Sequence, residues 1–430
     1  MNQSAVFRYA EYPDLANIDE TLYFPKVPEP TKGSNKANVD PKYKKRTAVV
    51  FEVQESREWT LDTTQYVRSM IMELSLHTGG EYEVFVLIEV LDDSEPIFNN
   101  RGVHHKIIER SVPREFQNIS FLFNRKLLQH WYPNVPRRPD EDLSSHSYAP
   151  LQLMSLARPD IEYFWLMDVD ARYTGHHYDH LEKISSWSKA QSREVLWELA
   201  SQLYVPEVHR AWKKFVTQVK DLARKATIRG PLRTKGIEPV GPPPPMMLSG
   251  KDQWGMGEEA DFITLGPVFD PQGSFFEGRE EVSNYPDGVE KTPRRATAFS
   301  FMTRTSKRLL RAMHHGQVTL GIHMPPSMFP ASTALHHGLK AVAFPLPISF
   351  DATISPQLLA EEFNHPDWGR HTYNVPYKYK DFWRWMTFAI AVDEEPAFAD
   401  EMYRRWLGYD ADQTRGLCLP GLLLHPVQGV

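Results

Sequence analysis

The spacing of apolar residues predicts an α/β protein with a mixed, Rossmann-like sheet flanked by helices. Short apolar runs typical of buried strands recur in the first part of the chain, at Ala48–Val53, Tyr82–Val90, Ile119–Phe123 and Tyr163–Met167. Segments with helical spacing stand between the first two runs and before the last one. Strands that alternate with helices favour a parallel sheet, because a parallel connection needs a long crossover, which a helix supplies.

The helix after the first strand has a start signal, an apolar face and a stop signal. Asp62 is expected to cap it, and Gly79-Gly80 is expected to end it. The i, i+3, i+4, i+7 spacing of one helical face is occupied by Val67, Met70, Ile71 and Leu74. A second helix is expected around Tyr148–Ala157, directly before the strand Tyr163–Met167.

The middle of the chain interrupts this pattern with an insertion over about 207–250. It begins with an amphipathic helix, Glu207–Ala226, and continues through the basic stretch Arg229–Lys235 to the proline run Pro242–Pro245. Such a composition predicts a mobile excursion from the sheet. The sheet is expected to resume later, in segments that include Asp261–Phe269, a helix Ser306–His314, a strand Leu339–Leu346 and helices Lys380–Val392 and Phe398–Leu407. We therefore predict an extended arm over 1–45, a single domain over 46–408 and a C-terminal tail over 409–430.

Composition excludes several classes of protein. The 430 residues carry 49 Lys and Arg against 55 Asp and Glu, a net charge of −6, which argues against a nucleic-acid-binding protein. The one cysteine, Cys418, permits neither an intrachain disulfide nor a cysteine-rich zinc site and suits a reducing compartment. Because no signal peptide and no membrane-length apolar stretch is seen, the expected location is cytoplasmic, with a Golgi or ER location open if an anchor was removed.

The sharpest chemical motif is Asp168-Val169-Asp170, at the end of an apolar strand. Side chains two apart in an extended chain point the same way, and open α/β sheets bind ligands at the C-terminal ends of their strands. Two carboxylates there suit Mg²⁺ or Mn²⁺ shared with substrate phosphates. The alternative is a chance Asp-x-Asp in a surface turn. Arg172 is a candidate partner for a phosphate, or for a local acid, and the next pair, His176 and His177, is either ligating or structural.

A second motif is the glycine-containing stretch Trp254–Asp261. Its glycines, Gly255 and Gly257, would let a ligand approach the backbone closely, and the acids Glu258 and Glu259 are candidate bases for an acceptor hydroxyl. Trp254 offers a flat face of the kind on which sugar rings stack. The alternative is a glycine-rich turn with solvated acids.

A third motif, Ala334–Lys340, contains a late histidine and a lysine. His337 could complete the metal site and Lys340 could contact a diphosphate. The alternative is a helix C-terminus with Gly338 as its terminator, and His323 is an equally weak candidate ligand.

Together these stretches resemble an uncharacterised, mainly fungal family of glycosyltransferase-like proteins with a GT-A type core. The resemblance spans about Arg46 to Gly408. The matching segments are Arg46–Val50, Met167–His176, Gly257–Asp261, Phe269–Pro271, Met328–Ala331, Ala334–Val342 and Arg404–Gly408. In that family the first acid of the strand-end motif is more often Glu, whereas this chain has Asp168. Many relatives carry an N-terminal anchor, which is not seen here.

The resemblance implies a hexosyltransferase that moves a sugar from a nucleotide-sugar donor, such as a UDP-sugar, to a hydroxyl acceptor. A Mn²⁺ or Mg²⁺ ion would be held by Asp168, Asp170 and His337, with Arg172 and Lys340 also near the donor. Glu258 or Glu259 would act as the base, and Trp254 and Gly257 would contact the acceptor, for which a small-molecule secondary metabolite is expected. Two alternatives remain open: a metal-dependent phosphohydrolase or nucleotidyltransferase, and a non-catalytic sugar- or nucleotide-binding protein.

Overall fold

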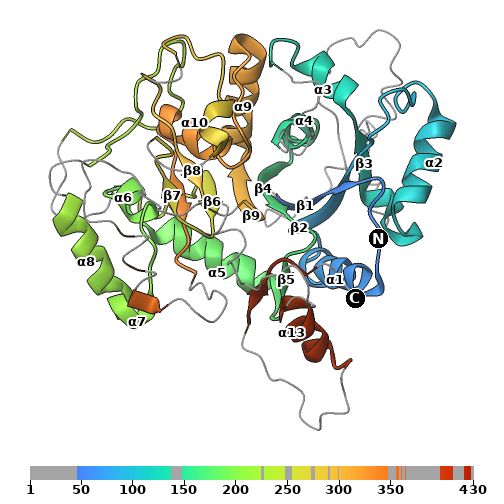
Figure 1. The fold of residues 1–430 in the computed structure, drawn as a ribbon, viewed down its shortest axis with the longest axis horizontal. Helices are drawn as coiled ribbons and strands as arrows, with labels where there is room; N and C mark the ends of the chain where they lie inside the picture. The colour runs from blue at the N-terminus through green and yellow to red at the C-terminus, as the bar shows by residue number, and fades with distance from the viewer. Residues whose placement is uncertain are drawn as a thin grey trace, which may run out of the picture. The chain divides into compact units, whose positions relative to one another are not determined.

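The chain divides into two compact units. Unit 1 comprises Met1–Val169 and Thr305–Gly321, and unit 2 comprises Asp170–Arg304 and Ile322–Val430. The computed structural model describes residues 46–136, 148–223, 227–246, 254–272, 277–288, 291–298, 300–346, 355–357, 360, 364, 398–409 and 421–427 (Figure 1). The arm expected over 1–45 and the helix expected over Lys380–Val392 lie outside the described residues. The region expected as a single domain thus contains parts of both units.

The main sheet has seven strands in the order β10-β6-β9-β4-β1-β2-β3 and is mostly parallel. Its strands are β1 (Arg46–Gln54), β2 (Tyr82–Glu89), β3 (Ser120–Phe123), β4 (Ile161–Met167), β6 (Phe262–Thr264), β9 (Met302–Ser306) and β10 (Ala341–Ala343). This confirms an α/β fold with a Rossmann-like sheet. Strand β10 is shorter than the expected strand Leu339–Leu346.

Unit 1 is built on four neighbouring parallel strands, β4-β1-β2-β3. The apolar runs become central strands because both faces are covered: every residue of β2 and β3 is buried. The helices of this unit are α1 (Leu61–Met70), α2 (Arg101–Ser111), α3 (Arg125–Trp131), α4 (Tyr148–Ala157) and α9 (Lys307–Leu320). Thr60, not Asp62, caps α1: its hydroxyl oxygen accepts a hydrogen bond from the Thr63 N–H at 3.2 Å.

An ion network links the N-terminal ends of three unit 1 strands, β1, β2 and β4. One carboxylate oxygen of Glu83 in β2 accepts from Arg46 of β1 at 2.5 Å, and the other accepts from Arg158, before β4, at 2.7 Å. Arg158 also pairs with Asp160 at 2.9 Å. Each guanidinium joins segments that are far apart in sequence, so the network fixes where these strands begin.

Among the described residues of unit 2 are the helices α5 (His177–Ala190), α6 (Leu196–Ala200), α7 (Pro206–His209), α8 (Trp212–Ala223), α10 (Phe329–His337) and α13 (Phe398–Leu407). The helix expected over Glu207–Ala226 is interrupted, because Arg210 has a φ of 63°, a left-handed conformation that no right-handed helix contains. The chain therefore turns between α7 and α8. Helix α13 has the expected bounds.

The proline-rich part of the insertion is anchored to α10. The N–H of Leu232 donates to the carbonyl oxygen of Leu335 at 3.2 Å, and that of Gly241 donates to the carbonyl oxygen of His337 at 2.8 Å. A Cβ built on Gly241 would lie 2.2 Å from the carbonyl oxygen of Gly338, so the backbone approach requires glycine at this position. These two backbone hydrogen bonds attach the described part of the insertion to α10, which sequence composition did not predict.

Residues expected as part of a tail also form a strand. The strand β11 (Leu423–Leu424) pairs antiparallel with β5 (Arg172–Tyr173), which directly follows the Asp-x-Asp motif (Figure 1). Leu424 and Val427 are buried with Tyr403 of α13 in a small apolar cluster. The C-terminal residues therefore belong to the packed part of unit 2.

Candidate functional site

Asp168 and Asp170 follow the C-terminal end of β4. The strand is held in place by its parallel partner β1, with Val50 opposite Leu166, and by burial of Phe164–Met167. Both aspartates are half-buried, while Val169 between them is 1 % exposed. The strand end predicted from sequence is therefore confirmed, and two carboxylates stand at the edge where parallel sheets bind ligands.

The backbone of Asp170 is tied to the C-terminal segment. Its carbonyl oxygen accepts a hydrogen bond from the Val427 N–H at 2.8 Å. The same segment pairs with the next residues of the motif, with Leu424 opposite Arg172 and Leu423 opposite Tyr173. Sequence reasoning missed this attachment, although the Leu-rich patch near the C-terminus is the signal that could have indicated it.

Arg172 is part of the packing of unit 2. Its side chain is fully buried, and its guanidinium carbon lies 5.8 Å from the centre of the Tyr403 ring. A cation over an aromatic face is stabilising in such a setting. The expected contact with a substrate phosphate would need exposure that this side chain does not have.

The histidines after the motif are structural in their described contacts. The ring nitrogen Nδ1 of His176 accepts from the Asp179 N–H at 3.4 Å, which caps α5. Burial lowers the pKa of His177 to about 3 and that of His180 to about 4, so both rings are neutral near pH 7. His180 stacks on Tyr173 with the ring centres 3.9 Å apart.

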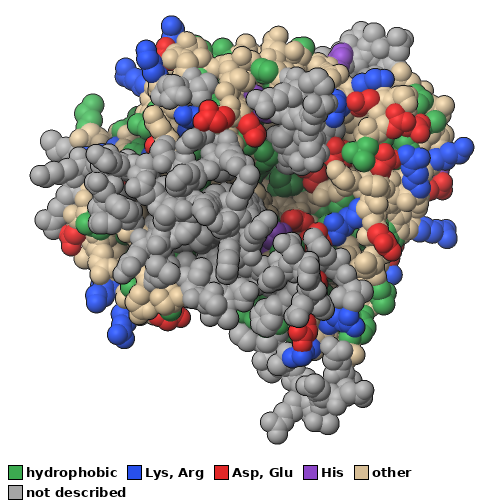
Figure 2. All heavy atoms as spheres, in the orientation of Figure 1, with side chains coloured by type: hydrophobic (Ala, Val, Ile, Leu, Met, Phe, Trp, Pro, Cys, Tyr) green, Lys and Arg blue, Asp and Glu red, His purple; other side chains and the backbone are tan. Residues whose placement is uncertain are grey.

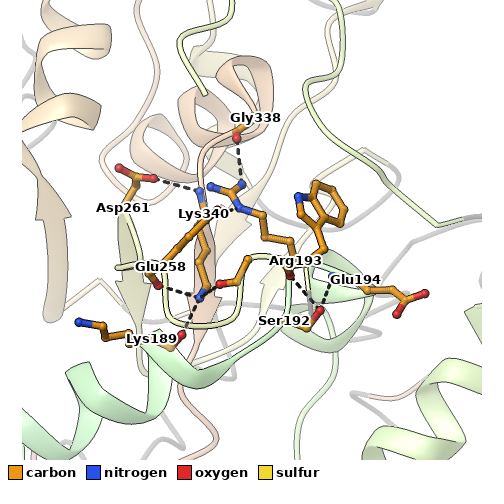
Figure 3. A network of polar contacts seen from close by, with 10 residues as sticks. Lys189, Ser192, Arg193, Glu194, Glu258, Asp261, Gly338 and Lys340 are labelled. Atoms are coloured by element: carbon orange, nitrogen blue, oxygen red, sulfur yellow. Dashed lines mark hydrogen bonds and ion pairs between the residues drawn. The ribbon is translucent and has the colours of Figure 1, made fainter. Parts of the chain in front are cut away.

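Lys340 is enclosed by backbone carbonyls rather than open to a diphosphate (Figure 3). Its ammonium donates to the carbonyl oxygens of Lys189 at 3.0 Å, Gly255 at 2.9 Å and Glu258 at 2.9 Å. These bonds use all three N–H donors of an ammonium group. Burial lowers the pKa of Lys340 to about 8, so the group is still mostly protonated at neutral pH. Lys340 is 0 % exposed, and its described contacts favour a structural role over the expected contact with a diphosphate.

Arg193 is the second buried cation of this network, and no motif pointed to it. Its Nε donates to a carboxylate oxygen of Glu258 at 2.6 Å, and its Nη1 donates to the carbonyl oxygen of Gly338 at 3.0 Å (Figure 3). Its backbone N–H donates to the Trp254 carbonyl oxygen at 2.7 Å. Arg193 thus connects the chain after α5, the glycine-rich turn and the end of α10.

The glycine-rich turn spans Trp254–Gly257, and its two glycines differ in their surroundings. Both have positive φ, 76° for Gly255 and 82° for Gly257. A Cβ on Gly255 would lie 2.3 Å from Cγ of Arg193, whereas one on Gly257 would meet nothing within 4 Å. Gly255 is therefore needed for close packing against Arg193, and Gly257 only for its backbone conformation. Trp254 is half-buried.

The two acids after the turn are both ion-paired. Glu259 lies 2.8 Å from Nζ of Lys189 and 3.3 Å from Nη2 of Arg304. Partial burial would raise its pKa, but the bond with Lys189 and the charges of Arg304 and Lys189 outweigh that effect and lower the pKa. A lowered pKa makes Glu259 the weaker candidate base of the two acids. The side chain of Glu258 is 43 % exposed and holds Arg193 through one of its two carboxylate oxygens.

His337 lies at the C-terminus of α10, as the structural alternative predicted. Gly338 ends the helix with a φ of 64°, and His337 is buried. The Nε2–H of its neighbour His336 donates to the carbonyl oxygen of Pro293 at 2.6 Å. Within the part of the chain that the structure describes, no three His, Cys, Asp or Glu side chains gather to hold a metal ion, so the trio Asp168, Asp170 and His337 is not assembled. His323 is likewise buried, in a bridge with Ser283.

The turn Trp254–Gly257 is followed by the partly exposed carboxylate of Glu258. The side chains of Lys340 and Arg193 hold this turn. The paired strands β6 and β10 begin directly after Asp261 and Lys340: the Asp261 N–H donates to the Lys340 carbonyl oxygen at 2.7 Å, and the Lys340 N–H donates to the Asp261 carboxylate at 3.1 Å. A fixed, partly exposed Glu258 can accept a hydrogen bond or a proton from a bound hydroxyl group.

The surface charge, the apolarity of the helices and the similarity to known proteins bear on the class to which this protein belongs. On the part of the surface that Figure 2 draws in colour, Lys and Arg side chains lie among Asp and Glu side chains. None of the described helices combines the length and apolarity needed to cross a membrane. A search of curated proteins returned no match to the chain. One family model, described as "Protein of unknown function (DUF3405)", matches residues 7–429, and the chain therefore belongs to that family.

Proposed function

We propose that this protein is a metal-dependent glycosyltransferase with a GT-A-like core, which moves a sugar from a nucleotide-sugar donor, such as a UDP-sugar, to a hydroxyl acceptor. The observation that carries the proposal is the pair Asp168 and Asp170 directly after the buried parallel strand β4. Parallel α/β sheets bind their ligands at this edge, and two oxygen donors suit a cation shared with phosphates.

The donor set fits Mn²⁺ or Mg²⁺. Both ions prefer carboxylate oxygens, and both aspartates are half-buried rather than enclosed. When bound, the ion would offset the negative charge that develops on the departing diphosphate. The chain's own contribution is to hold Asp170 through its backbone and to present both carboxylates from the end of a rigid strand.

The acceptor side of the proposal rests on Glu258. Glu259 makes ion pairs with Lys189 and Arg304, and its lowered pKa makes it a poor proton acceptor. Glu258 is the more exposed of the two, and Arg193 fixes its orientation. As the base, Glu258 would take the proton from the acceptor hydroxyl as that oxygen attacks the sugar carbon by direct displacement. A small-molecule acceptor is proposed.

The proposed set of donor and metal ligands is smaller than the set expected from the sequence. Lys340 and Arg172 are withdrawn as donor ligands, because both are fully buried. His337 is withdrawn as a metal ligand, since it is buried at the end of α10.

The test is a transfer assay with a panel of UDP-sugars and hydroxyl-bearing acceptors. Release of UDP is measured with Mn²⁺, with Mg²⁺ and with EDTA, and inorganic phosphate is measured in parallel. We expect metal-dependent release of UDP and a glycosylated product. Release of inorganic phosphate from simple esters would favour a phosphohydrolase, and binding of a nucleotide sugar without turnover would favour a non-catalytic binding protein.

A further inference from the structure

We propose that the C-terminal segment, residues 421–427, is a positioning element for the candidate metal ligand Asp170. This inference rests on the proposed function, because it concerns the same carboxylate. It adds a requirement that the motif itself does not contain: the cation site is complete only when a segment about 250 residues further along the chain is in place.

The attachment begins at Asp170 itself. The Val427 N–H donates to the Asp170 carbonyl oxygen at 2.8 Å. Asp170 lies in a turn rather than in a strand, so its conformation is not fixed by a sheet ladder. A hydrogen bond to the backbone of a ligand residue restricts its φ and ψ and thereby the direction of its carboxylate.

The segment then continues along β5. Leu424 pairs with Arg172 and Leu423 pairs with Tyr173 in antiparallel register. At the far end, the Thr174 N–H donates to the Leu422 carbonyl oxygen at 2.9 Å, and the Leu422 N–H donates to the Thr174 hydroxyl oxygen at 2.9 Å. Asp170, Arg172, Tyr173 and Thr174 are thus each paired with a residue of the C-terminal segment.

Side-chain packing holds the segment in this register. Leu424 and Val427 are buried with Tyr403. His425 stacks on Phe301 with the ring centres 4.4 Å apart and the planes at 12°. Gly421 is close to Tyr173, since a Cβ there would lie 2.3 Å from the tyrosine hydroxyl oxygen. Contacts at both ends leave little freedom for the segment to slide.

We therefore expect loss of the Val427 N–H group to weaken cation binding more than loss of the apolar Val427 side chain does. Val427→Pro removes the N–H that reaches Asp170 but keeps an apolar side chain, and Val427→Ala keeps the N–H but removes most of the side chain. Thr174→Val is a second control, because it removes only the hydroxyl that accepts from the Leu422 N–H and leaves the bond to Asp170 intact.

The measurement is titration of the full chain with UDP in the presence of Mn²⁺, together with the melting temperature of each variant. We expect Val427→Pro to bind UDP with Mn²⁺ at least tenfold more weakly than wild type. Val427→Ala and Thr174→Val should bind within about threefold, even where they melt lower. If Val427→Pro does not fold, two shortened chains replace it, one ending at Pro426 and one ending at Val427, of which only the second retains the N–H.

The outcomes separate this inference from the proposed function. Binding by Val427→Pro, or by the chain ending at Pro426, that equals wild type would overturn the positioning role while leaving the proposed function intact. If wild type itself binds no UDP with Mn²⁺, the proposed function fails first, and the positioning role fails with it. Equal losses in Val427→Ala and Val427→Pro would mean that the segment acts only through general packing, which also contradicts the inference.

Discussion

The ammonium nitrogen of Lys340 lies 2.9 Å from the carbonyl oxygen of Gly255, in a turn 85 residues earlier in the chain. The bond is one of three that Lys340 makes with backbone carbonyl oxygens. The turn is thus held by hydrogen bonds from a buried side chain, where a helix or sheet would use backbone–backbone hydrogen bonds. The candidate acceptor-side carboxylate is therefore positioned by an interior lysine and Arg193, not by the turn sequence alone.

Removing the ammonium should destabilise unit 2. Lys340→Met keeps the length of the side chain but leaves the carbonyl groups of Lys189, Gly255 and Glu258 without this donor, and we expect a loss of about 2–4 kcal/mol in the free energy of unfolding. Lys189→Met is the matched control, because it removes an exposed charge but keeps the Lys189 carbonyl, and it should cost less than about 1 kcal/mol. Denaturant unfolding of both variants checks this, and equal losses would contradict the structural role.

The two glycines of the turn should respond differently to alanine. Gly255→Ala adds a methyl group that would lie 2.3 Å from Cγ of Arg193, and we expect a loss of about 3 kcal/mol from the clash and the positive φ together. Gly257→Ala meets nothing within 4 Å and should cost only about 1 kcal/mol of backbone strain. Thermal unfolding of the two variants under one condition measures the difference, and the reverse order would show that the turn is packed differently.

Stability should fall as the pH drops from neutral towards 4, because buried histidines resist protonation. Burial lowers the pKa of His336 to about 4 from an ordinary value of 6.5, so below pH 6.5 the unfolded chain takes up a proton that the folded chain does not. The sign is therefore destabilising with acid, and His336 contributes about 2 kcal/mol between pH 7.5 and pH 5. Unfolding free energies of wild type and His336→Gln at both pH values test this. A pH dependence that is the same in the two proteins would contradict it.

The paired acids should separate in a transfer assay. Glu258→Gln should lower the rate of transfer at least a hundredfold, because the amide cannot take the proton of the acceptor hydroxyl. The donor affinity should survive. Glu259→Gln should weaken the ion pairs with Lys189 and Arg304 and lower stability, with a milder effect on turnover. Full transfer by Glu258→Gln would leave a different base, or a retaining mechanism, as the better account.

The sequence predicted the elements whose evidence is local. Apolar runs such as Ala48–Val53 become strands because they are covered on both faces, and Gly338 ends its helix because glycine tolerates the left-handed conformation. The predicted cap of α1, Asp62, lies two residues after the observed cap, Thr60. Thr and Asp are both common at helix N-caps, and only the geometry distinguishes the two positions.

The partners that act at long range could not be predicted. Lys340 was interpreted as a diphosphate ligand because nothing in the neighbouring residues reveals that three carbonyls enclose its ammonium. Arg193 lies in no motif. Its packing against the turn is visible only in the structure, where Gly255 has a positive φ and leaves no room for a Cβ beside the Arg193 side chain. The Leu-rich C-terminal patch was visible in the sequence, but its pairing with β5 depends on tertiary structure.

The central claim is that Asp170 holds a cation for a nucleotide-sugar donor, and calorimetric titration of UDP tests it most directly. Wild type should bind UDP with Mn²⁺ and lose this binding in EDTA. Asp170→Asn should lose the Mn²⁺-dependent binding while its circular dichroism spectrum is unchanged. Asp179→Asn, a change at an exposed acid in the first turn of α5, should bind like wild type. Equal binding of UDP and Mn²⁺ by Asp170→Asn and wild type would contradict the account.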